Sequence, residues 1–186
     1  MPESYSPQEA AIMAGVPLAA IQKAITARRI PARFGGAVKR RELNETALLA
    51  FALVEALPAE LHLSPGAAYE LLQSALTEPD ELTIGNLVRI DAGRALAGVR
   101  RRLRLYEHSR RMIVSDPEIM GGTPTIKGTR ITAQTLLGRI EGGDSVESIV
   151  ADYPMLDAEM IEAAVLYAKA NPPRGRPPGK LWRRAS

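Results

Sequence analysis

The sequence predicts a mainly α-helical protein, built from two small helical units with short β-strands and followed by an extended basic tail. Of its 186 residues 46% are apolar but only 4% are aromatic, so the core must come mostly from Ala, Leu, Ile and Val. Such a core suits closely packed helices. Helix start and stop signals recur along the chain, and its last segment is rich in Pro and Gly. A β-sandwich is not expected.

The composition also excludes several kinds of chemistry. Because the chain has no cysteine, it forms no disulfide, thiolate metal site or thiol nucleophile. The two histidines, His62 and His108, stand in no metal-ligand spacing. We therefore expect no enzyme activity, no bound metal and no cofactor. No stretch approaches the ~20 apolar residues of a membrane span, and the first residues do not resemble a signal peptide, so we expect a cytoplasmic protein that binds no membrane.

The charged residues are segregated along the chain. Residues 28–41 contain six basic side chains and no acid, residues 94–111 contain seven arginines and one acid, and residues 172–186 contain five basic side chains and no acid. In contrast, residues 141–162 hold seven acids and no Lys or Arg. This distribution favours binding of a polyanion by part of the surface, with solvated charged faces as the alternative.

The first unit, residues 1–57, begins with two short helices. Ser6, Pro7 and Glu9 form the pattern of a capping box with proline in the first turn, which predicts a helix to about residue 14. Gly15 ends that helix, and a second one is predicted from Pro17 to about residue 27. A hairpin follows, with strands at 30–34 and 37–41, and then a helix from a cap at residue 44 to about residue 56. Two helices around a glycine turn indicate a helix-turn-helix.

This order of elements resembles the winged helix-turn-helix domains of excisionase and MerR-type DNA-binding proteins. The residues that carry the resemblance are Glu9-Ala10-Ala11, Gly15-Val16-Pro17, Ile21, Arg29-Ile30-Pro31, Gly35-Gly36 and Asn44. The resemblance implies binding of DNA by the second helix and the hairpin, although the front of that helix is apolar. The candidate contacts are Gln22, Lys23, Thr26, Arg28, Arg29, Lys39, Arg40 and Arg41. A unit used for dimerisation or packing is the alternative.

Residues 58–108 are expected to link the two units. Ser64-Pro65 predicts a helix to about residue 76, residues 82–90 predict a strand, and residues 92–107 predict an amphipathic helix. That last helix carries four arginines, Arg100, Arg101, Arg102 and Arg104, which either contact phosphates or keep the helix soluble. We expect this segment to mediate dimerisation.

The second unit, residues 109–171, begins with turns and short strands. Strands are predicted at 112–114 and 125–126, with a double-glycine corner between them and a Gly128 turn after them. Three helices follow, one at 132–141, one from a cap at Asp144 or Ser145 to about residue 152, and one at 157–170; together they form a trihelical, helix-turn-helix-like unit. Arg130, at the corner before the first of these helices, is expected to bind Glu118 or to contact a phosphate.

This unit closely resembles a small domain long known only as a domain of unknown function. The shared motifs are D-P-E-I-x-G-G-x-P-x-I-x-G-T-R-I, here at 116–131, then E-G-G-x-S at 141–145, I-x-x-x-Y-P at 149–154, and E-x-I-x-A-A-x-x-Y-A at 159–168. In that family the domain occurs in VapB-like antitoxins, usually encoded beside a PIN-type ribonuclease toxin. The resemblance therefore implies an antitoxin that inhibits a PIN-type toxin nuclease and binds the promoter DNA of its own operon.

The tail, residues 172–186, is expected to be extended when free. The resemblance suggests that it inhibits the toxin, because an arginine-bearing peptide suits the acidic metal site of PIN-type nucleases. The candidate toxin contacts are Arg174, Arg176, Lys180, Trp182, Arg183 and Arg184. Two alternatives remain: Arg174-Gly-Arg-Pro177 resembles the core of an AT-hook that binds the DNA minor groove, or the tail is simply solvated.

Together these observations predict an antitoxin that neutralises its toxin and represses its own operon. We expect a homodimer, because two-fold operators match two-fold proteins, and a larger complex with the toxin. The alternative function is that of a stand-alone transcriptional regulator or architectural DNA-binding protein with no toxin partner.

Overall fold

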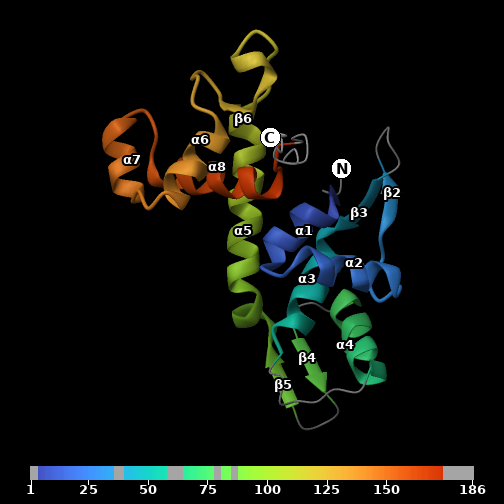
Figure 1. Ribbon diagram of the computed structural model, residues 1–186. Coiled ribbons are helices and arrows are strands. Elements are labelled where there is room, and N and C mark those ends of the chain that lie inside the picture. The colour runs from blue at the N-terminus through green and yellow to red at the C-terminus, as the bar shows by residue number, and fades with distance from the viewer. Residues whose placement is uncertain (1–3, 36–39, 58–64, 78–80, 85–87, 174–186) are drawn as a thin grey trace, which may run out of the picture.

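The computed structural model confirms the predicted fold class, since the protein is mainly helical with a few short strands. The structure describes residues 4–35, 40–57, 65–77, 81–84 and 88–173. One long helix, α5, runs through the middle of the molecule and separates two groups of shorter elements (Figure 1). The N-terminal helices lie on one side of α5, and the helices that follow it in sequence lie on the other side.

The first two helices begin and end where the sequence predicts. Helix α1 spans Pro7–Ala14, and the Ser6 side chain accepts a hydrogen bond from the Glu9 N–H while the Glu9 carboxylate accepts one from the Ser6 N–H, which completes the capping box. Gly15 ends α1 in a left-handed conformation, with φ of 76°. Helix α2 spans Leu18–Thr26 and packs against α1.

The predicted hairpin belongs to a three-stranded sheet. Strand β3 (Arg40–Asn44) pairs antiparallel with β2 (Arg33–Gly35) and, on its other edge, with β1 (Ser4–Tyr5). The predicted strand limits were wrong: β2 begins three residues later than expected, and Gly35 lies in a strand opposite Arg40. Strand β1 was not predicted, because two residues are too few to show an alternating pattern. Asn44 caps helix α3 (Glu45–Glu55), as predicted.

The linking segment contains a helix and a second hairpin. Helix α4 spans Pro65–Thr77 and packs against α3. The single strand predicted at 82–90 is wrong, because β4 (Glu81–Ile84) and β5 (Val88–Asp91) form an antiparallel pair in which Leu82 lies opposite Ile90. The sequence between these two strands contains the dipeptide Gly85-Asn86, a turn signal that could have divided the predicted strand.

Helix α5 spans Ala92–Met112 and is longer than predicted, since it continues for five residues past Glu107. Nothing between Glu107 and Met112 breaks a helix, and the Ser109 hydroxyl donates a hydrogen bond to the Tyr106 carbonyl instead of disrupting the chain. Within the ranges given above, no helix combines the length and the apolar character needed to cross a membrane.

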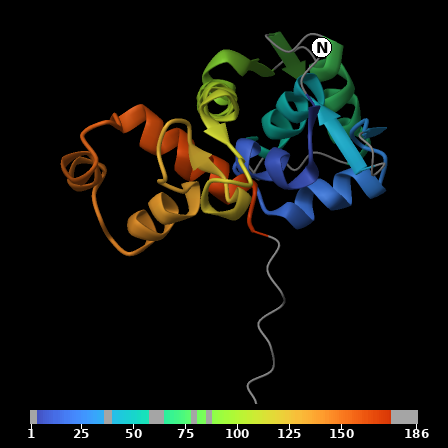
Figure 2. The ribbon, with the colours of Figure 1, turned by 90° about the horizontal axis from the view of Figure 1, so that it is seen from above.

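The remaining elements form the second group. Strands β6 (Ile113–Val114) and β7 (Thr125–Ile126) pair antiparallel, with a 3-10 turn, η2 (Met120–Gly122), between them. Three capped helices follow close to the predicted limits: α6 (Ala133–Glu141) from Thr132, α7 (Val146–Asp152) from Ser145 and α8 (Ala158–Ala170) from Asp157. Figure 2 shows this group beside the N-terminal group, with α5 between them.

Two clusters of buried apolar residues correspond to the two groups. The first cluster joins α1, α2 and α3 with α4 and most of α5, so the linking segment shares the core of the N-terminal helices. The second cluster is smaller and lies among β6, β7, α6, α7 and α8. Tyr167 of α8 packs against both clusters, and α8 packs along α5.

Candidate nucleic-acid interface

Helix α2 presents the polar side chains that the sequence singled out. Its inner face, formed by Ile21, Ala24 and Ile25, is buried, whereas Gln22, Lys23 and Thr26 are exposed on the outer face. The burial therefore follows the helical repeat, which leaves the candidate contacts on one accessible surface.

The turn after α2 holds a non-glycine residue in a left-handed conformation. Arg28 has φ of 54°, the Arg28 N–H donates to the Ile25 carbonyl at 3.1 Å, and the Arg29 N–H donates to the Ala24 carbonyl at 2.9 Å. This is the Schellman arrangement, in which the left-handed position is usually glycine. Helix α1 ends in the same way with Gly15 at that position, and the Val16 N–H reaches the Ala11 carbonyl at 3.0 Å.

Arg28 combines a strained backbone conformation with an exposed side chain. A left-handed backbone costs an L-residue with a side chain roughly 1–2 kcal/mol. Both Arg28 and Arg29 are exposed, and no described hydrogen bond or ion pair occupies either guanidinium. The turn thus projects two adjacent cations into solvent at the end of α2.

The hairpin contributes one further described cation. Arg41 of β3 is exposed, and its backbone lies opposite Phe34 in the sheet. Arg40 lies in the same strand opposite Gly35, whereas Lys39 lies outside the described residues.

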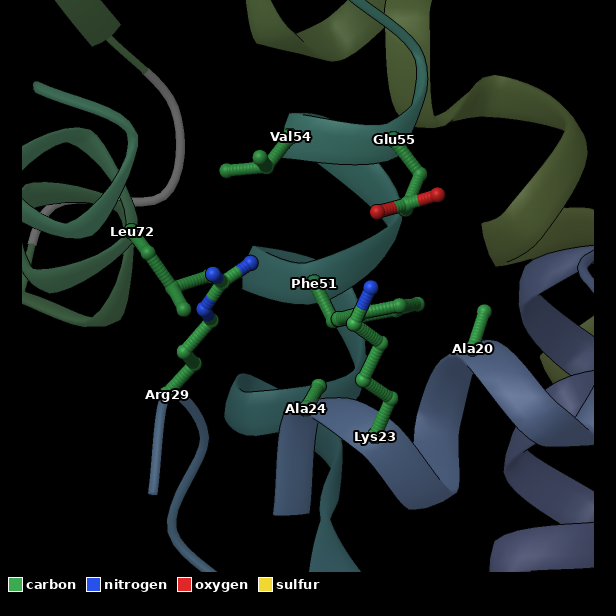
Figure 3. Close-up of a pocket in the computed structure, with 8 residues that line it drawn as sticks. All are labelled: Ala20, Lys23, Ala24, Arg29, Phe51, Val54, Glu55 and Leu72. Carbon is green, nitrogen blue, oxygen red and sulfur yellow. The ribbon is translucent and has the colours of Figure 1, made fainter. Parts of the chain in front are cut away.

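Two hollows flank α2 and divide the candidate side chains between them. The first has a volume of about 250 Å³ and lies between α2, α3 and α4, where Lys23 and Arg29 form part of its lining (Figure 3). The second, of about 530 Å³, lies between the end of α2 and the hairpin and brings together Thr26, Arg28 and Arg41. Gln22 lines neither hollow, so the structure gathers five of the predicted residues in two places.

The arginines of α5 are partly committed to structural contacts. The Arg102 Nε donates to the Met13 carbonyl at 2.7 Å, at the end of α1, and burial lowers the pKa of this guanidinium. A β-carbon at Gly15 would lie 3.0 Å from the Arg102 guanidinium, so glycine there also permits this approach. Arg101 pairs with Glu162 of α8. Sequence periodicity alone did not reveal these two roles, because both partners are distant in the chain.

The polar residues of the 116–131 motif stabilise its own turns. An Asp116 side-chain oxygen accepts a hydrogen bond from the Glu118 N–H at 2.9 Å, and the Thr129 hydroxyl donates to the Ile126 carbonyl at 2.9 Å. Gly128 has φ of 78°, which explains the glycine in the motif. Arg130 is exposed, and no described contact joins it to Glu118. The motif therefore has a structural explanation that requires no bound ligand.

Arg139 is the paired cation of the second group. Its guanidinium lies 2.5 Å from Asp144 and 2.6 Å from Asp152, and it sits over the Tyr153 ring at 5.6 Å. The hydrogen bonds to these two carboxylates raise the pKa of Arg139 above its ordinary value. The three partners come from the loop before α7 and from the end of α7, so Arg139 fastens this helix to α6.

Three hydrogen-bonded side chains, Tyr106, Glu9 and Asn171, form a polar joint between the two groups beside α5. The buried Tyr106 hydroxyl donates to the Glu9 carboxylate of the α1 capping box and accepts a hydrogen bond from the Asn171 amide at 3.0 Å. Burial and the bond to Glu9 raise the pKa of Tyr106 well above its ordinary value. The sequence pattern identified Tyr106 only as an apolar position of a helix, because its two partners lie 97 and 65 residues away.

The predicted toxin contacts fall outside the part of the chain that the structure describes. These residues are Arg174, Arg176, Lys180, Trp182, Arg183 and Arg184. The described chain ends just after Asn171, whose side chain is held by Tyr106 and by the Tyr167 carbonyl.

Comparison with known proteins finds a family that the second group matches, but no activity. Residues 113–168 match the family DUF433, described as a protein of unknown function. The uncharacterized protein y4eO of Sinorhizobium fredii is 34% identical over 137 residues, which is 74% of this chain and 59% of that protein. The crystal structure of Rv2018 from Mycobacterium tuberculosis covers 87% of this chain and 96% of its own, at 14% identity and a TM-score of 0.34, which is too weak to establish a shared fold.

Proposed function

We propose that this protein is the antitoxin of a type II toxin-antitoxin system. In this proposal it binds and inhibits a PIN-type ribonuclease toxin, and it represses its own operon by binding promoter DNA as a homodimer. Support comes from the DUF433 match over residues 113–168 and from the resemblance of the motifs at 116–168 to the domain found in VapB-like antitoxins.

The observation that carries the DNA-binding part of the proposal is Arg28. The left-handed position after α2 is an arginine, Arg28, whereas the equivalent position after α1 is a glycine, Gly15. The Arg28 side chain is exposed and has no described partner. Strain at such a position commonly accompanies function, because the rest of the structure must hold it in place. A guanidinium that contacts a phosphate would explain an arginine at this position.

In this arrangement the cations position the protein and the polar residues of α2 read the bases. Lys23, Arg28 and Arg29 would contact phosphates beside the groove that α2 enters, and Arg40 and Arg41 would contact the backbone from the hairpin. Gln22 and Thr26 are the exposed residues of α2 with hydrogen-bonding groups for base edges.

Promoter binding tests this part directly. Replacing Lys23, Arg29, Arg40 and Arg41 together by Ala should weaken binding to the operon's promoter and reduce the salt slope by about 1 for each phosphate that the variant no longer neutralises. The control replaces Lys127 and Lys169, two exposed cations of the second group, by Ala. An unchanged slope in the first variant would show that DNA is bound elsewhere.

The tail is proposed to inhibit the toxin. Arg174 and Arg176 would engage the carboxylates of the nuclease metal site, while Lys180, Trp182, Arg183 and Arg184 add contacts around it. Co-expression with the protein encoded next to it, followed by purification through a tag on one partner, tests whether a nuclease binds. Truncation after Asn171 should leave the fold intact and restore RNA cleavage. Continued inhibition would instead place the inhibitory contacts in the folded part of the chain.

A stand-alone regulator is the rival outcome of the same experiment. The exposed cations around α2 suit either function, so they do not distinguish the two. If no adjacent small nuclease gene exists and nothing co-purifies, the antitoxin proposal fails and only promoter binding remains to be tested.

A further inference from the structure

The first hollow beside α2 combines an apolar floor with two cations. Phe51 of α3, Leu72 of α4 and Ala24 of α2 are 5%, 4% and 5% exposed, so they support the floor from within the packed core. The apolar surface that stays accessible comes from Ala20 of α2 and Val54 of α3, which are partly exposed. Figure 3 shows the side chains of Lys23 and Arg29 extending from α2 and the turn after it toward α3, with Leu72 facing them from α4. Glu55 lies at the α3 side of the hollow.

From this geometry we infer that the hollow binds a small organic anion, with an apolar body on Ala20 and Val54 and an anionic end between Lys23 and Arg29. The volume of about 250 Å³ lies just below the range of about 300–1,000 Å³ that is usual for small-molecule sites. Such sites are mostly apolar and have a few polar groups that orient the ligand, which is the composition found here.

A phosphodiester backbone alone would leave the floor of this hollow unused. The two cations can pair with phosphates, but a phosphate brings no apolar group to cover the partly exposed Ala20 and Val54. An aromatic or branched carboxylate covers the floor and also gives Lys23 and Arg29 a charge-assisted partner, which neither has among the described residues. The site is therefore more specific than a surface for polyanions.

Glu55 adds a condition on the ligand. Its exposed carboxylate shares the hollow with the two cations and repels an anion that enters without orientation. A ligand must therefore place its charge toward Lys23 and Arg29 and direct its apolar part, or a hydrogen-bond donor, toward Glu55.

Occupation of this site has a consequence for DNA binding, and here alone the inference rests on the proposed function. Lys23 and Arg29 are proposed to contact phosphates, so a bound anion competes for the same charges. A small organic anion would then act as an inducer that weakens promoter binding.

The probe for the experiment is 2-naphthoate, titrated into the full chain without DNA and followed by ligand fluorescence and by amide NMR shifts. Its uncharged analogue, 2-naphthamide, serves as the comparison. We expect saturable binding of the naphthoate, with NMR shifts confined to α2, α3 and α4. The amide should bind about tenfold more weakly, because it is uncharged and forms no ion pair with Lys23 or Arg29.

Matched variants separate this site from general attraction of anions. Lys23→Gln and Arg29→Gln should each weaken binding about tenfold, whereas Glu55→Gln should leave it unchanged or tighter. Ala20→Leu narrows the hollow without changing charge and should abolish saturable binding, while Ala19→Leu, at an exposed neighbour that does not line the hollow, should not. Melting temperatures of the variants show that each is folded.

The inference is overturned if naphthoate binding is absent or is insensitive to Ala20→Leu. The two proposals fail separately. If naphthoate binds in the hollow but the protein does not bind promoter DNA, the ligand site stands and the DNA-binding proposal fails. If the protein binds promoter DNA but not naphthoate, only the ligand-site inference fails.

Discussion

The two groups of elements differ in how they use their cations and their left-handed turns. In the second group Arg139 is held by two carboxylates and an aromatic ring, and glycines occupy the left-handed positions at 121, 122, 128 and 143, with Met120 as the exception. In the first group Lys23, Arg29 and Arg41 have no described partner, and an arginine occupies the left-handed turn after α2. Arg139 is therefore held by partners within the second group, whereas the exposed cations around α2 have charges available for a partner.

The largest expected effect tests the glycine turns of the second group. Gly128→Val should destabilise the protein by about 1–3 kcal/mol, because valine at φ of 78° is strained even where space is open. Gly138→Ala is the matched control, since Gly138 lies in α6 with open space around it and alanine there should stabilise by about 0.5–1 kcal/mol. Urea denaturation measures both. An unchanged stability for Gly128→Val would remove the argument from its backbone conformation.

The next effect concerns the joint between the groups. Tyr106→Phe removes the hydrogen bonds to Glu9 and from Asn171 and should cost about 1–2 kcal/mol, because each of these two side chains loses one of its hydrogen bonds in a partly buried site. Urea denaturation of the variant beside the natural chain measures this cost.

The same variant predicts a change in pH dependence. The folded state raises the pKa of Tyr106, so its contribution to stability is complete below the ordinary pKa near 10 and is lost as pH rises above it. Denaturation between pH 9 and 11 should therefore show a shallower alkaline loss of stability in Tyr106→Phe than in the natural chain; the raised pKa of Tyr167 is common to both. Identical slopes would show that Tyr106 is not coupled to folding.

A smaller effect of opposite sign separates stability from function in the first group. Arg28→Gly should stabilise the protein by about 1 kcal/mol, because it relieves the left-handed strain, and it should weaken promoter binding. Thermal denaturation and promoter titration on the same sample test both signs. A loss of stability would mean that the Arg28 side chain contributes contacts to the fold.

The smallest expected effects come from a comparison of Arg139, which has two carboxylate partners, with Lys23, which has no described partner. Arg139→Gln should lower the melting temperature slightly, because exposed ion pairs contribute little, and should leave promoter binding unchanged. Lys23→Gln should do the reverse. If both variants behave alike, the distinction between the two groups is wrong.

Much of the fold was predictable from local signals. The capping residues Ser6, Asn44, Thr132, Ser145 and Asp157 marked helix starts correctly, and Gly15, Gly128 and Gly143 marked turns with positive φ. These features depend on neighbouring residues, which is why one sequence is enough to predict them.

Features that depend on distant residues were missed. The pairing of Ser4–Tyr5 with β3, the cap of α1 by Arg102 and the joint at Tyr106 all connect residues far apart in sequence. The candidate site was predicted in part, since basic composition and helical spacing located Lys23, Arg28, Arg29 and Arg41. Their division between two hollows required the positions of α3 and α4.

Helix α5 has a mechanical consequence for the whole molecule. It is one unbroken helix of 21 residues, about 31 Å long, and it contributes to the first cluster and leads directly into β6 of the second. Each residue of an α-helix advances about 1.5 Å and turns about 100° around the helix axis. The length of α5 therefore sets the angle between the two groups about that axis. One residue inserted into α5 just after Tyr106 would rotate the second group by about 100° about the helix axis. Asn171 would then be separated from Tyr106, and Ala170 and Tyr167 of α8 would leave the first cluster.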